Sequence, residues 1–356
     1  MGGGASRFGG PGGGALWDML ALAVPCLRPS WLTRCRKRPR AARSALGLVL
    51  GLVVVGCPAP EGRGPTRPIA APATPFAQRD VELLDARVRF IDEGPRGAPV
   101  LVLIPGHTSR IEEYDGLVPA LSRRHRVLVL DFPGSGYAEK PEREYTLAYY
   151  EDVVVALLDE LQLERAHLAG GSLGGNLVLR LAHRFPERFE RLAAWAPGSA
   201  WEARPRVAAL LRAIASYAAF RPIVWIQSRY WYDESFAGRD AALAATFGYY
   251  DEVMSPGFVR MYFGMAADQV ERSLFPLAPE ISHEVWLGWG ARDHGADMGA
   301  GVARLHELLP RSELYVFPGA GHALATEVPA ALAERIDAFL ARPTAAVGTK
   351  GAEHVD

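Results

Sequence analysis

The octapeptide Leu168–Gly175 (LAGGSLGG) constrains the fold more than any other part of the chain, because it places a serine between a strand pattern and a helix pattern. Residues 164–169 (ERAHLA) are predicted to form a short buried strand, and residues 173–185 (LGGNLVLRLAHRF) an amphipathic helix. The junction carries a Gly-x-Ser-x-Gly element, whose members are Gly170, Ser172 and Gly174.

A strand that turns sharply into a helix holds the intervening serine in a strained conformation, with its hydroxyl exposed at the edge of a sheet. Glycines two residues before and after Ser172 relieve the crowding at such a turn. The following helix offers free N–H groups and the positive end of its dipole to a developing negative charge. The alternative is a chance Gly- and Ser-rich turn, which the flanking patterns disfavour.

The length and composition of the chain limit the classes of protein to which it can belong. At 356 residues the chain exceeds an average domain, yet α/β folds of this size often form a single core. Its 39 basic and 40 acidic residues leave a net charge of −1, so the composition does not predict a nucleic-acid partner. All three cysteines, Cys26, Cys35 and Cys57, lie in the first sixth of the chain. The body is therefore expected to hold no thiol nucleophile, disulfide framework or metal cluster built on cysteine.

The N-terminal region is predicted to be an export signal that ends at Cys57. A basic cluster precedes a 12-residue apolar run, 45–56, which fits the hydrophobic region of a signal peptide, whereas a membrane-spanning helix needs about 20 residues. The run ends in Gly56-Cys57, which resembles the lipobox of bacterial lipoproteins, in which the cysteine is lipidated. The basic residues are Arg34, Arg36, Lys37, Arg38, Arg40 and Arg43.

This resemblance implies an exported protein tethered to a bacterial membrane, on its periplasmic or cell-surface side. Pro58 follows the cysteine instead of the aspartate associated with inner-membrane retention, which favours the outer membrane. Residues 58–79 form a linker, in which six prolines lie before Gln78. The alternatives are an apolar anchor that stays uncleaved, secretion after cleavage at another position, or N-myristoylation at Gly2. Met19 is an alternative translation start.

The body from about residue 80 alternates strand and helix patterns, which predicts a mostly parallel eight-stranded sheet with helices on both faces. Thr146 is the expected N-cap of a long helix that extends to Leu161, and residues 342–356 are expected to be disordered. Beyond the strand that precedes Ser172, the predicted strands are 81–84, 86–92, 99–104, 126–131, 189–195, 284–289 and 312–317, and the closing helix is 329–340.

The interval 200–279 interrupts this alternation, dividing the predicted core into 80–199 and 280–341. It is helical in pattern and rich in aromatic residues, so it is predicted to form a lid, or cap, over an apolar pocket. The alternative for each aromatic side chain is a place in the core of the cap itself. The aromatic residues are Trp201, Tyr217, Phe220, Trp225, Tyr230, Trp231, Tyr232, Phe236, Phe247, Tyr249, Tyr250, Phe258, Tyr262 and Phe263.

The order of these elements resembles the α/β-hydrolase fold over roughly residues 80–341. The resemblance implies a catalytic triad in the chain order serine, acid, histidine, which Ser172, Asp293 and His322 match. Both partners follow predicted strands, and His322 lies in a glycine-rich loop (FPGAGH). His322 would take the proton of Ser172, while Asp293 would orient the imidazole. Asp297 is the alternative acid.

The same resemblance implies an oxyanion hole formed by two backbone N–H groups, those of Leu173 and His107. The loop that carries His107 reads Ile104-Pro105-Gly106-His107-Thr108, where the family usually has His-Gly-x-x. This departure places the His107 side chain near the pocket, where it contacts substrate or faces solvent. Gly106, Thr108 and Gly171 are the further predicted substrate-binding residues. The turn 131–136 (DFPGSG) resembles the structural turn after the fourth strand and carries no predicted catalytic role.

These features predict a serine hydrolase that cleaves an apolar carboxylic ester through an acyl-enzyme, with no metal or organic cofactor. The same triad is compatible with carbon–carbon bond hydrolysis, amide or peptide hydrolysis, or cofactor-free peroxidation, because one fold hosts all of these chemistries. Dehalogenases and epoxide hydrolases of this fold usually carry aspartate at the elbow, so Ser172 argues against them. A non-catalytic lipoprotein on a hydrolase fold is the alternative from another class.

Overall fold

The computed structural model describes residues 71–293 and 298–342. Several predicted features lie outside these residues: the signal region, the lipidation site Cys57, linker residues 58–70, the alternative acid Asp297 and the tail from residue 343. Within the described ranges, no helix has both the length and the apolar character needed to cross a membrane.

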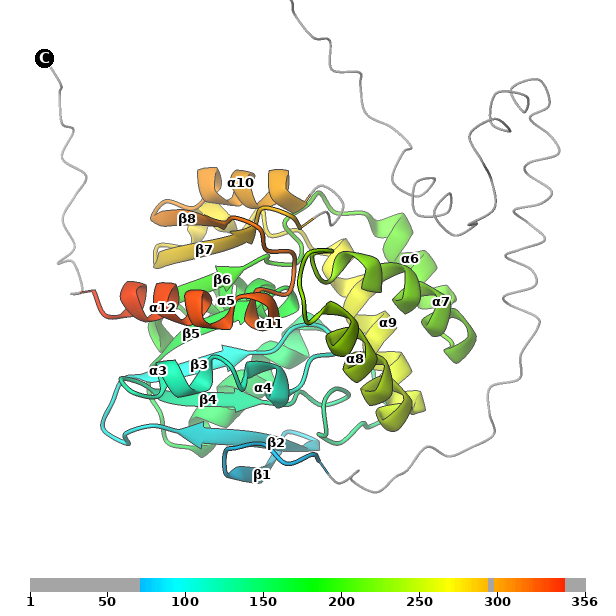
Figure 1. Cartoon of the computed structure of the whole chain (residues 1–356), viewed down its shortest axis with the longest axis horizontal. Helices are drawn as coiled ribbons and strands as arrows, with labels where there is room; N and C mark the ends of the chain where they lie inside the picture. The colour runs from blue at the N-terminus through cyan, green and yellow to red at the C-terminus, as the bar shows by residue number, and fades with distance from the viewer. Residues whose placement is uncertain (1–70, 294–297, 343–356) are drawn as a thin grey trace, which may run out of the picture.

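An eight-stranded sheet forms the centre of the molecule (Figure 1). Its strand order is β1-β2-β4-β3-β5-β6-β7-β8. The first two strands run antiparallel to their neighbours, and the six from β3 onward are parallel. This arrangement confirms the predicted fold class. The strands are β1 (Gln78–Leu83), β2 (Ala86–Glu93), β3 (Val100–Ile104), β4 (Arg126–Leu130), β5 (Ala166–Gly171), β6 (Phe189–Trp195), β7 (Glu284–Gly290) and β8 (Ser312–Phe317).

Helices cover both faces of the sheet, so the central strands are apolar on both sides. One core layer packs the helices α4 (Leu147–Glu160), α5 (Leu173–Arg184) and α10 (Met298–Leu308) against the sheet. The opposite layer contains α3 (Val118–Leu121), α11 (Leu324–Glu327) and α12 (Pro329–Leu340). As predicted, the Thr146 side chain caps α4 by accepting a hydrogen bond from the N–H of Tyr149.

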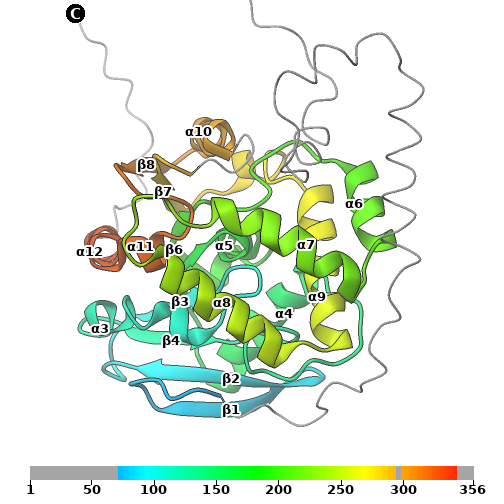
Figure 2. The same ribbon diagram turned by 45° about the vertical axis from the view of Figure 1, so that its right-hand side comes forward.

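Four helices within the interval 200–279 stand beside the carboxyl edge of the sheet and form the cap (Figures 1 and 2). They are α6 (Pro205–Ala213), α7 (Tyr217–Gln227), α8 (Arg239–Val253) and α9 (Pro256–Glu271). Their aromatic side chains mainly pack on one another: Phe220 makes edge-to-face contacts with Tyr250, Phe258 and Tyr262, with ring centroids 4.8–5.5 Å apart. These four rings therefore form the core of the cap, whereas Trp225 is exposed.

Further helices lie in the connections between strands and include elements that the sequence patterns did not indicate. A 3₁₀ turn, η3 (Ile111–Tyr114), and α3 together connect β3 to β4, and α10 connects β7 to β8. Gly299 and Gly301 lower the helix propensity of α10, so its pattern was weak. The other 3₁₀ turns are η4 (Pro186–Arg188), η5 (Ser228–Tyr230) and η6 (Ala278–Glu280).

The strand before Ser172 lies two residues later than the predicted 164–169, because it continues through Gly170 and Gly171. Glycine has low β-propensity, so an apolar pattern ends at Ala169. In the sheet, however, Gly170 pairs with Ile104 of β3 and with Ala194 of β6. The extension brings the strand directly to Ser172.

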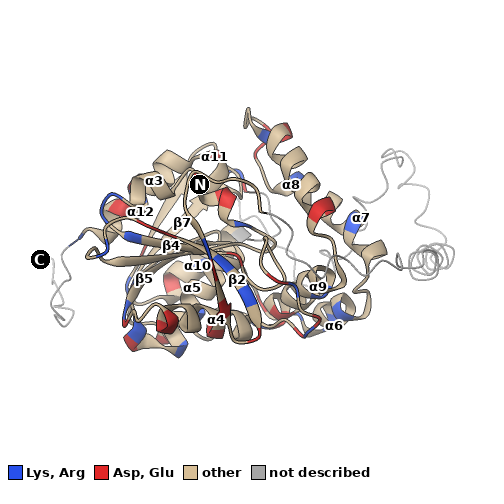
Figure 3. Cartoon of the chain, turned by 90° about the horizontal axis from the view of Figure 1, so that it is seen from below, with Lys and Arg blue, Asp and Glu red and all other residues tan. Residues whose placement is uncertain are grey.

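Charged residues of both signs are distributed over the helices, strands and loops (Figure 3), in keeping with the net charge of −1. One buried group of charges lies next to the carboxyl edge. Arg89 of β2 donates from Nε to Asp131 at 2.8 Å and from two further nitrogens to Glu112 at 2.7 and 3.1 Å. The Asp131 carboxylate also accepts from the backbone N–H of Ile111 and Tyr137. This network fixes the turns after β3 and β4.

Candidate active site

Ser172 occupies the turn between β5 and α5 in a left-handed conformation, with φ 55° and ψ −118°. This backbone conformation is strained for a residue other than glycine, and the surrounding hydrogen bonds hold Ser172 in it. The Ser172 N–H donates to Trp195 O at 3.0 Å, and its carbonyl accepts from the N–H of Asn176 and of Gly198. This geometry is that of a nucleophile elbow, which presents the serine hydroxyl at the sheet edge.

The glycines around Ser172 are required by close packing. A Cβ on Gly170 would lie 2.7 Å from the carbonyl carbon of Gly174 and 2.9 Å from Ile104 O. A Cβ on Gly174 would collide with Ile104 O, and one on Gly171 with the indole of Trp195. The start of α5 therefore lies against the end of β3, which brings the elbow next to the Gly106 loop.

Asp293 and His322 meet although 29 positions separate them in the sequence, because β7 and β8 are neighbours and both residues follow the carboxyl ends of these strands. His322 Nδ1 lies 2.7 Å from Asp293 Oδ2. The Asp293 side chain is fully buried, and that of His322 is 20% exposed. This hydrogen bond fixes the ring so that Nδ1 carries the proton and Nε2 the lone pair.

The environment of His322 stabilises its charged form. Burial is the largest effect and opposes the imidazolium, but the charge and hydrogen bond of Asp293, with a smaller contribution from Glu327, outweigh it. The pKa of His322 is therefore raised above its usual 6.5. An imidazole with a raised pKa is a stronger base for a serine proton.

Ser172 follows β5, Asp293 follows β7 and His322 follows β8. In the sheet, β6 lies between β5 and β7. Asp293 and His322 are in direct contact. Among the hydrogen bonds of the described ranges, none joins the Ser172 hydroxyl to His322. Catalytic hydrogen bonds of this kind commonly tighten only in the complex with substrate.

The two predicted oxyanion donors lie on either side of the elbow. Leu173 is the first residue of α5, so its N–H has no partner within the helix. Gly106 lies so close to the elbow that a Cβ on it would be 3.7 Å from Ser172 Cβ. In the described part of the chain, the N–H groups of Leu173 and His107 donate no hydrogen bond. Both are thus free for a negative oxygen.

The His107 side chain packs under the cap instead of facing solvent. Its imidazole stacks on Tyr262 of α9, with ring centroids 4.9 Å apart and planes 14° apart, and its Nε2 is buried without a hydrogen-bond partner in the described structure. Burial lowers the pKa of His107 to about 4, against a smaller opposing effect of a hydrogen bond to the Tyr262 backbone. His107 is therefore neutral at neutral pH.

Two further polar contacts connect the Gly106 loop with its surroundings, and no sequence pattern indicates either contact. Thr108, with φ 64°, places its hydroxyl 2.7 Å from the hydroxyl of Tyr250 on α8. Ser109 donates to the Glu113 carboxylate at 2.6 Å, and burial raises the pKa of this carboxyl. The first of these contacts joins the Gly106 loop directly to the cap.

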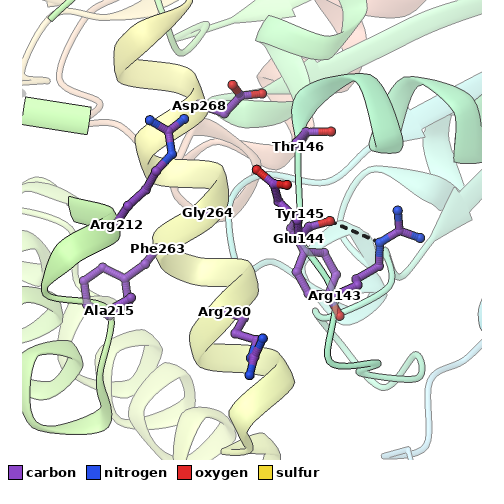
Figure 4. A pocket seen from close by; sticks show the side chains of 10 residues that line it. All are labelled: Arg143, Glu144, Tyr145, Thr146, Arg212, Ala215, Arg260, Phe263, Gly264 and Asp268. Carbon is purple, nitrogen blue, oxygen red and sulfur yellow. Dashed lines mark hydrogen bonds between the residues drawn. The ribbon is translucent and has the colours of Figure 1, made fainter. Parts of the chain in front are cut away.

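Other features of the described residues do not add to the site. No group of three or more His, Cys, Asp or Glu side chains there is arranged to hold a metal ion. A surface groove of about 250 Å³ between the cap and the segment before α4 contains none of the predicted site residues (Figure 4). Its arginines are each paired with an acid, in the pairs Arg143–Asp85, Arg212–Glu271 and Arg260–Glu142.

Residues 99–327 match the family model for the alpha/beta hydrolase fold. The chain is 27% identical over 283 residues to a 2-hydroxymuconate semialdehyde hydrolase from Pseudomonas sp. strain CF600, covering 77% of this chain and 97% of that protein.

Solved structures share the same fold. An enol-lactonase from Burkholderia xenovorans LB400 superposes with a TM-score of 0.66 at 23% identity, covering 74% of this chain and 100% of that one. A membrane phospholipase A, a bacterial virulence factor, gives a TM-score of 0.62 at 21% identity and covers 91% and 96% of the two chains.

Proposed function

Because this chain belongs to the α/β-hydrolase fold family, we propose that it is a serine hydrolase that cleaves a carboxylic ester through an acyl-enzyme on Ser172. The observation that carries the proposal is the 2.7 Å hydrogen bond between His322 and the buried Asp293, on the same sheet edge as the strained Ser172. These are the parts that a serine nucleophile requires: an exposed hydroxyl, a base, and a group that orients the base.

In the first half of the reaction, Ser172 Oγ attacks the ester carbonyl carbon while its proton passes to Nε2 of His322. Nε2 is the accepting atom because Nδ1 already donates to Asp293. The carbonyl oxygen becomes negative and receives hydrogen bonds from the N–H groups of Leu173 and His107. The carbon–oxygen bond to the alcohol then breaks, and His322 returns the proton to the leaving oxygen.

In the second half, water attacks the acyl carbon and gives a proton to His322. The same two N–H groups stabilise the second tetrahedral intermediate. The bond between the acyl carbon and Ser172 Oγ breaks, Oγ regains the proton from His322, and the acid leaves. No step requires a metal or an organic cofactor.

The aromatic cap favours an ester with an apolar acyl or alcohol group, since buried rings stabilise apolar surface. An enol-lactonase and a membrane phospholipase A share this fold, and lactones and phospholipids are both esters.

Turnover of p-nitrophenyl butyrate by the full-length chain tests this proposal. We expect hydrolysis by the wild type and its loss in Ser172→Ala, with Ser122→Ala, a matched change at the end of α3, as active as the wild type. Turnover that survives in Ser172→Ala would contradict the elbow assignment. A wild type without turnover would reject simple ester hydrolysis.

Carbon–carbon bond hydrolysis by the same triad is the second candidate. It is favoured by the match to a 2-hydroxymuconate semialdehyde hydrolase, which covers 97% of that protein. The loss of absorbance of 2-hydroxymuconate semialdehyde would measure this reaction. We expect the wild type to process the ester with the higher kcat/KM, and the reverse order would make the carbon–carbon reaction the main activity.

We further propose that the protein is exported and tethered to a membrane through a lipid on Cys57, as the lipobox resemblance implies. A single lipid chain binds membranes only weakly, so a stable tether requires the multiple acylation that bacterial lipoproteins carry. Cys57→Ala is expected to abolish labelling by a fatty-acid probe and to move the protein out of the membrane fraction. Unchanged fractionation would reject the tether.

A further inference from the structure

Glu327, at the end of α11, accepts hydrogen bonds from three backbone N–H groups on two different segments. Its Oε2 accepts from Gly321 at 2.9 Å and from Asp233 at 3.1 Å, and its Oε1 accepts from Ala323 at 3.3 Å. Gly321 and Ala323 are the two neighbours of His322. One carboxylate therefore holds both sides of the histidine loop and also a residue of the cap region.

Further contacts fix segment 231–235 of the cap region to the same loops. The Ala323 N–H, which is shared with Glu327 Oε1, also donates to Trp231 O at 3.0 Å. The Asp233 carboxylate pairs at 2.8 Å with Arg292, the residue before Asp293. The segment thus contacts the histidine loop on one side and the loop of the catalytic acid on the other.

Close packing leaves no space between these segments. A Cβ on Gly321 would lie 2.7 Å from the Asp233 backbone nitrogen and 2.9 Å from Glu327 Oε1. Arg292 N–H in turn donates to Ala320 O at 2.9 Å, which joins the acid loop to the histidine loop. A displacement of segment 231–235 would therefore be transmitted to the backbone on either side of His322.

We propose that Glu327 is a positioning residue that seats segment 231–235 of the cap on the loops of His322 and Asp293, so that Ser172 is activated fully only when the cap is seated. The inference rests on the proposed serine-hydrolase function and deepens it by making the cap part of the catalytic geometry. Three N–H groups converge on one carboxylate, and charge-assisted hydrogen bonds of this kind are stronger than neutral ones. A glutamine there keeps one acceptor oxygen and introduces donors that face N–H groups.

The first test measures the rate at which a fluorophosphonate probe labels Ser172 in the full-length chain. This readout depends on activation of Ser172 by His322 and does not depend on which ester is the substrate. Glu327→Gln is expected to label about tenfold more slowly, because small displacements of a catalytic base reduce rates strongly. Glu334→Gln, an exposed glutamate on the neighbouring α12, is the matched control and is expected to label at the wild-type rate.

The pH dependence of labelling separates positioning from a merely structural role. The charged groups that raise the pKa of His322 are Asp293 and Glu327, and burial, the largest effect, opposes them. Removing the Glu327 charge lowers the pKa of His322, so the acid limb of the labelling rate moves to lower pH in Glu327→Gln. An unmoved acid limb together with a wild-type rate would overturn the proposal.

A second variant tests the link through the cap. Asp233→Asn removes the ion pair with Arg292 and leaves the Asp233 N–H bond to Glu327 in place. In the otherwise wild-type protein we expect Asp233→Asn to lower the labelling rate about threefold. In the Glu327→Gln variant the same change is expected to lower the rate by a smaller factor, because the two contacts hold the same segment. If Asp233→Asn lowers the labelling rate by the same factor with and without Glu327→Gln, Glu327 does not act through segment 231–235.

The outcomes also distinguish the two proposals. If the wild type labels but does not hydrolyse esters, the ester proposal fails and the labelling rates still test Glu327. If the wild type hydrolyses esters and Glu327→Gln labels like the control, the inference about Glu327 fails alone. Should Glu327→Gln unfold, as judged by circular dichroism, Asp233→Asn decides by itself: a wild-type rate would overturn the proposal.

Discussion

Two buried aspartates follow strands at the same edge of the sheet, Asp131 after β4 and Asp293 after β7, yet their surroundings suit them to different tasks. Asp131 faces Arg89, whose guanidinium keeps its proton at any physiological pH, and it also accepts two backbone hydrogen bonds. Asp293 faces His322, whose imidazole can gain and lose a proton and whose pKa is raised above its usual 6.5.

The partner of a buried aspartate, more than the carboxylate itself, therefore decides its role. With a permanently charged arginine, Asp131 holds the turns after β3 and β4 in place. With a titratable histidine, Asp293 can stabilise a charge that appears only during the reaction. The region after β4 is therefore expected to govern stability, and the region after β7 is expected to govern chemistry.

The largest expected effect is that of Asp293→Asn on catalysis. An asparagine keeps the shape of the side chain but favours the wrong tautomer of His322, so kcat for p-nitrophenyl butyrate is expected to fall about 10⁴-fold. The melting temperature is expected to change little. A variant that keeps more than a tenth of the wild-type kcat would remove Asp293 from the triad and direct attention to Asp297.

Asp131→Asn is expected to act on stability instead. It leaves the buried Arg89 without one of its two carboxylate partners, and breaking a buried ion pair destabilises a fold by about 3–5 kcal/mol. Urea unfolding would measure this loss. Glu202→Gln breaks an exposed pair with Arg304 and serves as the control, with an expected loss below about 1 kcal/mol. A large loss of kcat in folded Asp131→Asn would contradict the division of roles.

The third prediction concerns the pH dependence of catalysis. Only neutral His322 can take the Ser172 proton, and its pKa lies above 6.5 because Asp293 and Glu327 outweigh the opposing effect of burial. We therefore expect kcat/KM to fall about tenfold for each pH unit below that raised pKa. A profile from about pH 5 to about pH 9 measures the acid limb. A midpoint below 6.5 would show that Asp293 does not stabilise the imidazolium.

The smallest expected effect tests the strain at the elbow. Ser172 has φ 55°, a conformation that glycine adopts without strain, so Ser172→Gly is expected to stabilise the inactive protein by about 1 kcal/mol. Ser122→Gly is the matched control, because Ser122 has φ −68° and is expected to lose stability on the same change. Urea unfolding of both variants gives the comparison. Destabilisation at Ser172 would mean that the elbow stores no strain.

Much of the fold could be predicted from local sequence patterns. Continuous apolar runs marked the central strands, because both faces of a parallel sheet are covered. The predicted bounds 189–195, 312–317 and 329–340 agree with β6, β8 and α12. The residues predicted for the site follow strand ends, so the sheet alone was sufficient to bring Asp293 and His322 together.

Contacts between distant segments could not be predicted in this way. Nothing near Glu327 in the sequence indicates that its carboxylate binds the backbone of Asp233, 94 positions earlier. The stacking of His107 on Tyr262 likewise depends on how α9 lies over the Gly106 loop. Such contacts are set by the docking of the cap on the sheet, and neither helix periodicity nor a motif encodes that docking.

The most direct test of the account is the site and rate of fluorophosphonate labelling in the wild type and in His322→Ala, followed by intact mass and peptide mapping. We expect one adduct, on Ser172, formed at neutral pH in the wild type and at least about 100-fold more slowly in His322→Ala. An adduct on another residue, or equal labelling of Ser172 in the two proteins, would contradict it.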